Sequence, residues 1–151
     1  MNNSNREQKN ILIFFFWLEV LIFAAMIFTL SSKSYPLPAL TKIKIRNFDK
    51  VLHVIEYSAF GYLLLKAFST TFDFRSSAKL VIVVLAVGFI YALTDEYHQA
   101  CIPCRESSVL DAAADLCGLT VASLIWFRLP VLRTFSVIRS VVRGFAIVTG
   151  I

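Results

Sequence analysis

Four long apolar runs alternate with short polar segments along the chain. The runs cover residues 11–30, 49–69, 79–99 and 107–128. About 20 predominantly apolar residues in helical conformation span the hydrocarbon core of a bilayer, which is about 30 Å thick. The pattern therefore predicts an all-α membrane protein, a bundle of four transmembrane helices that forms a single domain over residues 1–151.

Proline and polar residues separate the runs and set the expected helix ends. Pro36 and Pro38 follow the first run, inside a basic connector over residues 31–48, and Pro130 follows the fourth. Proline ends a helix because it lacks an amide hydrogen and its ring clashes with the preceding turn. Residues 131–151 then place three arginines among aliphatic residues, which favours an amphipathic helix lying in the membrane interface over a fifth span.

The composition agrees with a surface that faces lipid. Of the 151 residues 58% are hydrophobic, whereas soluble domains are about 45–50% apolar, and the mean hydropathy is +0.71. The net charge of +5 comes from cations beside apolar runs, with little polar surface between them, so no nucleic-acid partner is predicted. Lysine and arginine are somewhat more frequent on the side of the termini, so we expect both termini in the cytoplasm.

Polar residues recur at helical spacing inside three of the runs, and so share one face in each. They are Asp49, His53 and Tyr57 in the second run, Tyr91, Asp95 and His98 in the third, and Asp111 and Asp115 in the fourth. Because consecutive spans are antiparallel, the start of the second, the end of the third and the start of the fourth meet at one membrane face. Ser107 or Ser108 suits the cap of the fourth helix. We expect a polar pocket at this face, which the orientation makes extracytoplasmic.

Charged groups inside a membrane segment are costly, which makes these residues a candidate functional site. Imidazole and carboxylate groups carry protons near neutral pH, and if the protein is an enzyme we expect His53 and Asp95 to act as an acid/base pair. The candidate catalytic residues are His53, Asp95, Asp111 and Asp115, and the candidate ligand-binding residues are Asp49, Lys50, Tyr57, Glu96, His98, Gln99 and Arg105. The alternative interpretation is a buried hydrogen-bond network that holds the bundle together.

Several other residues leave alternatives open. Two histidines with carboxylates can bind zinc, but the chain has no compact motif such as H-E-x-x-H, so no metal is predicted and no cofactor is assigned. Arg105 can pair with Asp111 or with a ligand phosphate. Cys101 and Cys104 fit a redox pair, half a zinc site or a local disulfide. Glu19 lies near the middle of the first run, and the sequence suggests no functional role for it.

The order and spacing of these polar motifs resemble the VanZ-like family of small bacterial membrane proteins. The matching pieces are Asp49-Lys50-x-x-His53 with Tyr57, Asp95-Glu96-x-x-Gln99, Arg105, Asp111, Gly118 and the Ser31-Ser32 segment. The chain departs from the pattern at Asp115, where the family often has Asn, and at Cys104, where it often has Gly. The resemblance covers the first to the fourth run. It implies a multi-pass protein of the bacterial cytoplasmic (inner) membrane and an association with low-level resistance to the glycopeptide teicoplanin.

Three functions are compatible with these observations. In the first, the polar pocket binds, and as an enzyme modifies, the head group of a phospholipid or a lipid-linked envelope precursor, with Lys50, Arg105 and the basic connector attracting its anionic part. The second is a non-enzymatic accessory protein of the envelope. The third, a proton-coupled transporter, ranks last because the charged residues stop at one face apart from Glu19. Enzymatic activity and a homo-oligomeric state are left open.

Overall fold

The computed structural model describes residues 3–33, 48–103 and 108–128, with side chains from residue 6 onward. Within these ranges the regular structure is entirely helical. The helices are α1 (Asn3–Ser31), α2 (Phe48–Thr71), α3 (Ser77–Ala100) and α4 (Val109–Arg128). Each is long and apolar enough to cross a membrane, so the predicted bundle of four transmembrane helices is confirmed. The predicted interfacial helix at 131–151 lies outside the described residues, as does most of the basic connector.

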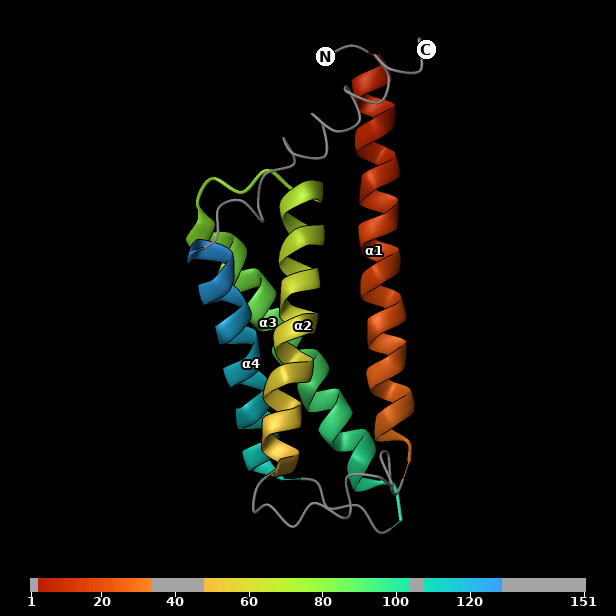
Figure 1. The fold of residues 1–151 in the computed structure, drawn as a ribbon, viewed down its shortest axis with the longest axis vertical. Coiled ribbons are helices and arrows are strands. Elements are labelled where there is room, and N and C mark those ends of the chain that lie inside the picture. Colours follow the sequence, from red (N-terminus) through yellow and green to blue (C-terminus); the bar gives the residue numbers. More distant parts are fainter. Residues whose placement is uncertain (1–2, 34–47, 104–107, 129–151) are drawn as a thin grey trace.

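Helix α1 begins at Asn3, well before the expected start at residue 11. The residues in front of the apolar run include Arg6, Glu7, Gln8 and Lys9, all of which have high intrinsic helix propensity. The helix therefore continues beyond its membrane-spanning part, and its first turns extend past the ends of the other helices (Figure 1). The apolar pattern marks the span and not the end of the helix.

Serine residues cap two of the helices. Ser76 has an extended backbone, and its Oγ accepts a hydrogen bond from the amide of Lys79 at 3.3 Å. Ser108 Oγ accepts one from the amide of Leu110 at 3.1 Å, so Ser108 fills the cap position predicted for the fourth helix. Such bonds satisfy amide groups that have no partner inside the helix.

The helices are arranged so that one end of the bundle collects the residues singled out by the sequence. In Figure 1, α2 stands between α1 and α4, and α3 crosses behind it. The last turns of α1 and α3 and the first turns of α2 and α4 lie at the same end, which we call the site end. Helices α2 and α4 make the most extensive contact, while α1 packs mainly on α2 and less on α3.

A glycine allows α2 and α4 to approach closely near the site end. A Cβ atom added to Gly118 would lie 2.5 Å from the carbonyl oxygen of Val54 and 2.9 Å from the amide nitrogen of Ser58. Ser58 Oγ also donates to the carbonyl of Gly118 at 3.1 Å. Small residues at a membrane helix interface permit this backbone contact, which fixes the register of the two helices that carry most of the site.

The apolar side chains divide between a packed interior and an outer surface. Tyr57, Leu65 and Leu119 are completely buried between the helices. In contrast, Phe14 and Leu21 on the outer side of α1 are each 64% exposed. An exposed surface of large apolar side chains is rare on soluble monomers, and it matches the hydrocarbon that surrounds a membrane helix.

Glu19 has a partner that the sequence did not reveal. Lys66 on α2 donates to Glu19 Oε2 at 2.5 Å, and its ammonium group lies 4.2 Å from the centre of the Phe16 ring. The lysine belongs to an apolar run far away in sequence, and only the packing of α1 on α2 brings the two charges together. The ion pair offers a structural role for Glu19 and joins α1 to the rest of the bundle.

Candidate functional site

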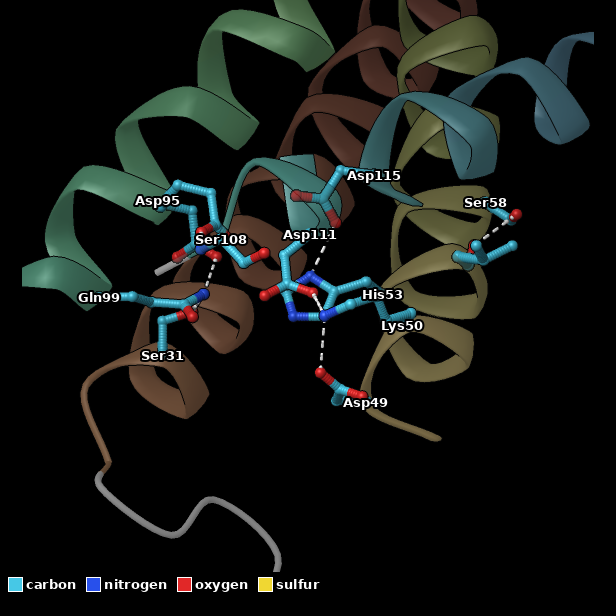
Figure 2. A network of polar contacts seen from close by, with 12 residues as sticks. Ser31, Asp49, Lys50, His53, Ser58, Asp95, Gln99, Ser108, Asp111 and Asp115 are labelled. Atoms are coloured by element: carbon cyan, nitrogen blue, oxygen red, sulfur yellow. Dashed lines mark hydrogen bonds and ion pairs between the residues drawn. The ribbon is translucent and has the colours of Figure 1, made fainter. Parts of the chain in front are cut away.

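Polar side chains from three helices converge inside the bundle at the site end (Figure 2). We call the following residues the polar cluster: Asp49, Lys50 and His53 of α2, Asp95, Glu96 and Gln99 of α3, and Asp111 and Asp115 of α4. The carboxylates of α3 and α4 are all buried, with Asp115 completely so. These residues were predicted to lie at a similar depth in the bundle, and the structure brings them together in one cluster.

His53 and Asp115 form the central contact between α2 and α4. His53 Nδ1 lies 2.8 Å from Asp115 Oδ1, and the imidazole is largely buried. Asp95, the expected acid/base partner of His53, instead accepts a hydrogen bond from Gln99. The reason is the packing: α4 is the closest neighbour of α2, and Gly118 lies one turn beyond Asp115.

Lys50 connects the same two helices nearer the membrane surface. Its ammonium group is 2.8 Å from Asp49 Oδ2 and also pairs with Asp111 Oδ1. Asp49 is largely exposed and Asp111 is buried, so the lysine links the interior to the outside. Arg105, the other expected partner of Asp111, lies outside the described residues, as does Cys104. Cys101 is exposed and has no disulfide partner within the described part of the chain.

Gln99 and Glu96 connect α3 to its neighbours. Gln99 Nε2 donates to Asp95 Oδ2 at 2.8 Å and to Ser31 Oγ of α1 at 3.3 Å (Figure 2). Glu96 Oε2 accepts the backbone amide of Ser108 at 3.0 Å, directly before α4. Sequence reasoning missed the contacts of both serines, although Ser31 belongs to one of the motifs matched to the VanZ-like pattern.

Two of the expected ligand-binding residues make contacts of a different kind. His98 Nε2 is 3.0 Å from Ser32 Oγ, and its ring stacks on Phe28 with centroids 4.4 Å apart. His98 therefore contacts α1 and is not a member of the polar cluster. Tyr57 is completely buried and packs edge-to-face on Phe60. Its hydroxyl has no hydrogen-bond partner among the residues that the structure describes.

The polar cluster contains more acidic groups than basic ones and is incompletely hydrogen-bonded. Five carboxylates face one lysine and one histidine in the set defined above. In the polar cluster, three buried carboxylate oxygens have no hydrogen-bond partner among the described residues: Asp95 Oδ1, Glu96 Oε1 and Asp115 Oδ2. An unsatisfied buried acceptor costs about 1–3 kcal/mol, and more when it is charged. The arrangement can accept hydrogen-bond donors or a cation from a ligand.

Two grooves on the outer surface lie away from the polar cluster. One, of about 430 Å³, runs along α1 beside Trp17 and Leu21. The other, of about 420 Å³, lies between α2 and α4 and is lined by small residues such as Ser58 and Ala122. Neither groove includes a residue of the polar cluster.

Comparison with known proteins agrees with this arrangement of helices and motifs. The family model described as VanZ/LLP1 matches residues 1–133, which include α1 to α4 and the whole polar cluster. The chain belongs to the VanZ/LLP1 family. No curated protein and no solved structure matches it. As a VanZ/LLP1 member with four apolar helices, the chain is a multi-pass membrane protein.

Proposed function

We propose that this VanZ/LLP1 protein is a component of the bacterial cell envelope that binds the polar head group of a phospholipid or of a lipid-linked precursor in its polar cluster. The observation that carries the proposal is a buried, acidic and incompletely hydrogen-bonded cluster close to one end of a membrane bundle. His53 is the sixth residue of α2, about 7–9 Å along the helix axis from its start. At this depth a lipid head group meets the membrane interface.

The charges of the cluster favour a head group that carries hydrogen-bond donors as well as a phosphate. Lys50 is the cation that a phosphate is expected to meet, since it is partly exposed, and the phosphate would have to displace Asp49 or Asp111 from it. The unpartnered carboxylate oxygens behind it are acceptors and suit an amine or hydroxyl groups. A zwitterionic or hydroxyl-rich head group therefore fits better than a bare phosphate.

Modification of the head group is the second candidate function, and the geometry of His53 favours it. A carboxylate bound to one ring nitrogen, as Asp115 is to Nδ1, fixes the orientation of an imidazole and stabilises its protonated form. His53 would then act as the acid/base group, with Asp115 positioning it. A purely binding protein needs the shape and charge of the cluster but no titrating group, so it should tolerate Asp115→Asn better than an enzyme would.

The test of binding is native mass spectrometry of protein purified in mild detergent together with its lipids. We expect one lipid to remain bound to the wild-type protein, and retention to fall at least about tenfold in Lys50→Gln and His53→Ala. The matched control is Lys79→Gln, which removes an exposed lysine at the opposite end of the bundle and should retain the lipid. Equal retention in all variants would contradict the proposal.

The association with teicoplanin resistance is a proposal of the same kind and rests on the family alone. It is tested by expressing wild-type protein and Lys50→Gln in a teicoplanin-sensitive bacterium. We expect the wild type to raise the inhibitory concentration and the variant to lose that effect while still inserting into the membrane. A variant as protective as the wild type would separate resistance from head-group binding.

A further inference from the structure

Three potential metal ligands meet inside the polar cluster, one from each of three helices. They are His53 of α2, Glu96 of α3 and Asp115 of α4, and one ligand atom of each lies within 4.8 Å of the others. Around a Zn²⁺ ion with bonds of about 2.0–2.2 Å, ligand atoms are roughly 3.3 Å apart. The ligand atoms would have to move closer together by up to about 1.5 Å to reach that spacing.

Among the described residues, each of the two carboxylates has one oxygen with a partner and one without. Glu96 Oε2 is held by the backbone amide of Ser108, and Asp115 Oδ1 is held by His53. The second oxygen of each carboxylate, Glu96 Oε1 and Asp115 Oδ2, is buried and has no hydrogen-bond partner in the described part of the chain. For Glu96 this arrangement is typical of metal sites, in which a hydrogen bond from outside the site fixes one part of a ligand while another part stays available.

The charge of the site also favours a bound cation. Glu96 is 8% exposed and Asp115 is 0% exposed, and the ammonium group of Lys50 is already paired with Asp49 and Asp111. Buried charges must be paired, neutralised by a proton or bound to a metal. His53 is hydrogen-bonded to Asp115, while Glu96 accepts a neutral backbone amide, so a divalent ion would balance the two carboxylates.

We propose that His53, Glu96 and Asp115 bind one divalent transition-metal ion, such as Zn²⁺ or Mn²⁺. One imidazole and two carboxylates suit either ion, and three protein ligands leave a coordination position open for water or a ligand oxygen. The site stands on the three side chains alone and does not require the head-group proposal. If both hold, the ion gives an acidic cluster a way to bind a phosphate.

The test measures metal binding by the full chain in detergent. The protein is stripped with EDTA, dialysed against Zn²⁺ or Mn²⁺ alone, and its metal content is measured by plasma mass spectrometry. We expect one equivalent per chain in the wild type and at least a tenfold weaker affinity in His53→Ala and in the isosteric Glu96→Gln. Asp73→Asn, which changes an exposed carboxylate between α2 and α3, is the matched control and should bind as the wild type does.

Two results would overturn the site. One is the absence of saturable binding to the wild type, and the other is wild-type affinity in both ligand variants, which would show adventitious binding elsewhere. Thermal unfolding of the wild type alone provides an independent measurement, because an ion that binds only the folded bundle raises its Tm. If neither Zn²⁺ nor Mn²⁺ raises the Tm above its value in EDTA, the site is also refuted, independently of the metal affinities of the variants.

The metal and lipid experiments fail independently. Metal content is measured without added lipid, and lipid retention is measured in EDTA as well as in metal. Metal binding without lipid retention would leave the site standing and remove the head-group proposal. Lipid retention in EDTA, by a protein that binds no metal, would do the opposite.

Discussion

Replacing Gly118 with alanine is expected to destabilise the bundle by separating α2 from α4. The new Cβ atom would lie 2.5 Å from the Val54 carbonyl oxygen and 2.9 Å from the Ser58 amide nitrogen. Both are backbone atoms, so no side chain can rotate away and the helices themselves must move. The shift would also weaken the 3.1 Å bond from Ser58 to the Gly118 carbonyl.

The magnitude follows from three opposing contributions. Overpacking of a well-packed core costs about 1–3 kcal/mol, and an interhelical hydrogen bond in a membrane contributes about 0.6 kcal/mol. Alanine in place of glycine gains about 1 kcal/mol of helix propensity. Because the contacts at Gly118 are with backbone, we place the variant near the upper part of the range, at roughly 2 kcal/mol of net destabilisation.

Gly88 provides the matched control. A Cβ atom there would lie 2.6 Å from Leu119 Cδ2 and 2.9 Å from Cδ1, which are the far end of a flexible side chain. Gly88→Ala should therefore change the free energy of unfolding by less than about 1 kcal/mol, since the gain in helix propensity offsets most of the crowding. The assay is unfolding by SDS in mixed micelles, followed by tryptophan fluorescence. Wild-type stability of Gly118→Ala, or a larger loss in Gly88→Ala, would refute the reasoning.

Three further predictions concern other parts of the bundle. Lys66→Met leaves Glu19 without its ion-pair partner and should destabilise the protein by about 1–2 kcal/mol in SDS unfolding, whereas the double variant with Glu19→Gln should recover most of the loss. His98→Phe keeps the stacking on Phe28 but loses the bond to Ser32, so it should cost about 0.6 kcal/mol and leave lipid retention in the native mass spectrum unchanged. In a background without the three native cysteines, Asp73→Cys should react with a membrane-impermeant maleimide only after cells are permeabilised, and labelling in intact cells would reverse the expected orientation.

The number of spans and the level of the site could be predicted from the sequence for simple physical reasons. A bilayer of fixed thickness requires apolar runs of a certain length, and such runs are visible without any knowledge of packing. Residues four apart lie on one helix face, so the positions of Asp111 and Asp115 place both on one side of α4. Because consecutive helices are antiparallel, the polar faces of α2, α3 and α4 then meet at the site end of the bundle.

The hydrogen-bond partners of the polar residues could not be predicted. Polar residues at helical spacing identify a helix face, but they do not show which other helix that face contacts. His53 contacts Asp115 and not Asp95 because Gly118 lets α4 come closest to α2. His98 shares a run with Asp95, yet it contacts α1 through Ser32. These outcomes depend on the crossing of whole helices, which is set by side-chain packing along their full lengths.

Other features escaped prediction because their signals are weak in a single sequence. The pair of Glu19 and Lys66 joins two runs that are distant in the chain, and each run alone shows one of the two charges without its partner. The triad of His53, Glu96 and Asp115 has its potential ligands on three helices, so no compact sequence motif contains them. Glu96 in particular stands beside Asp95 in sequence, and only the structure shows that the two carboxylates have different partners.

The most direct test of head-group binding is to locate a lipid on the protein in the membrane. A phospholipid with a photoreactive diazirine in its head group would be crosslinked in membranes, and the labelled peptides identified by mass spectrometry. The account predicts labelling at the first turns of α2 and α4, around His53 and Asp111, that an excess of unlabelled lipid competes away and that Lys50→Gln reduces. Labelling concentrated at the opposite end, around residues 72–76, or labelling that Lys50→Gln leaves unchanged, would contradict it.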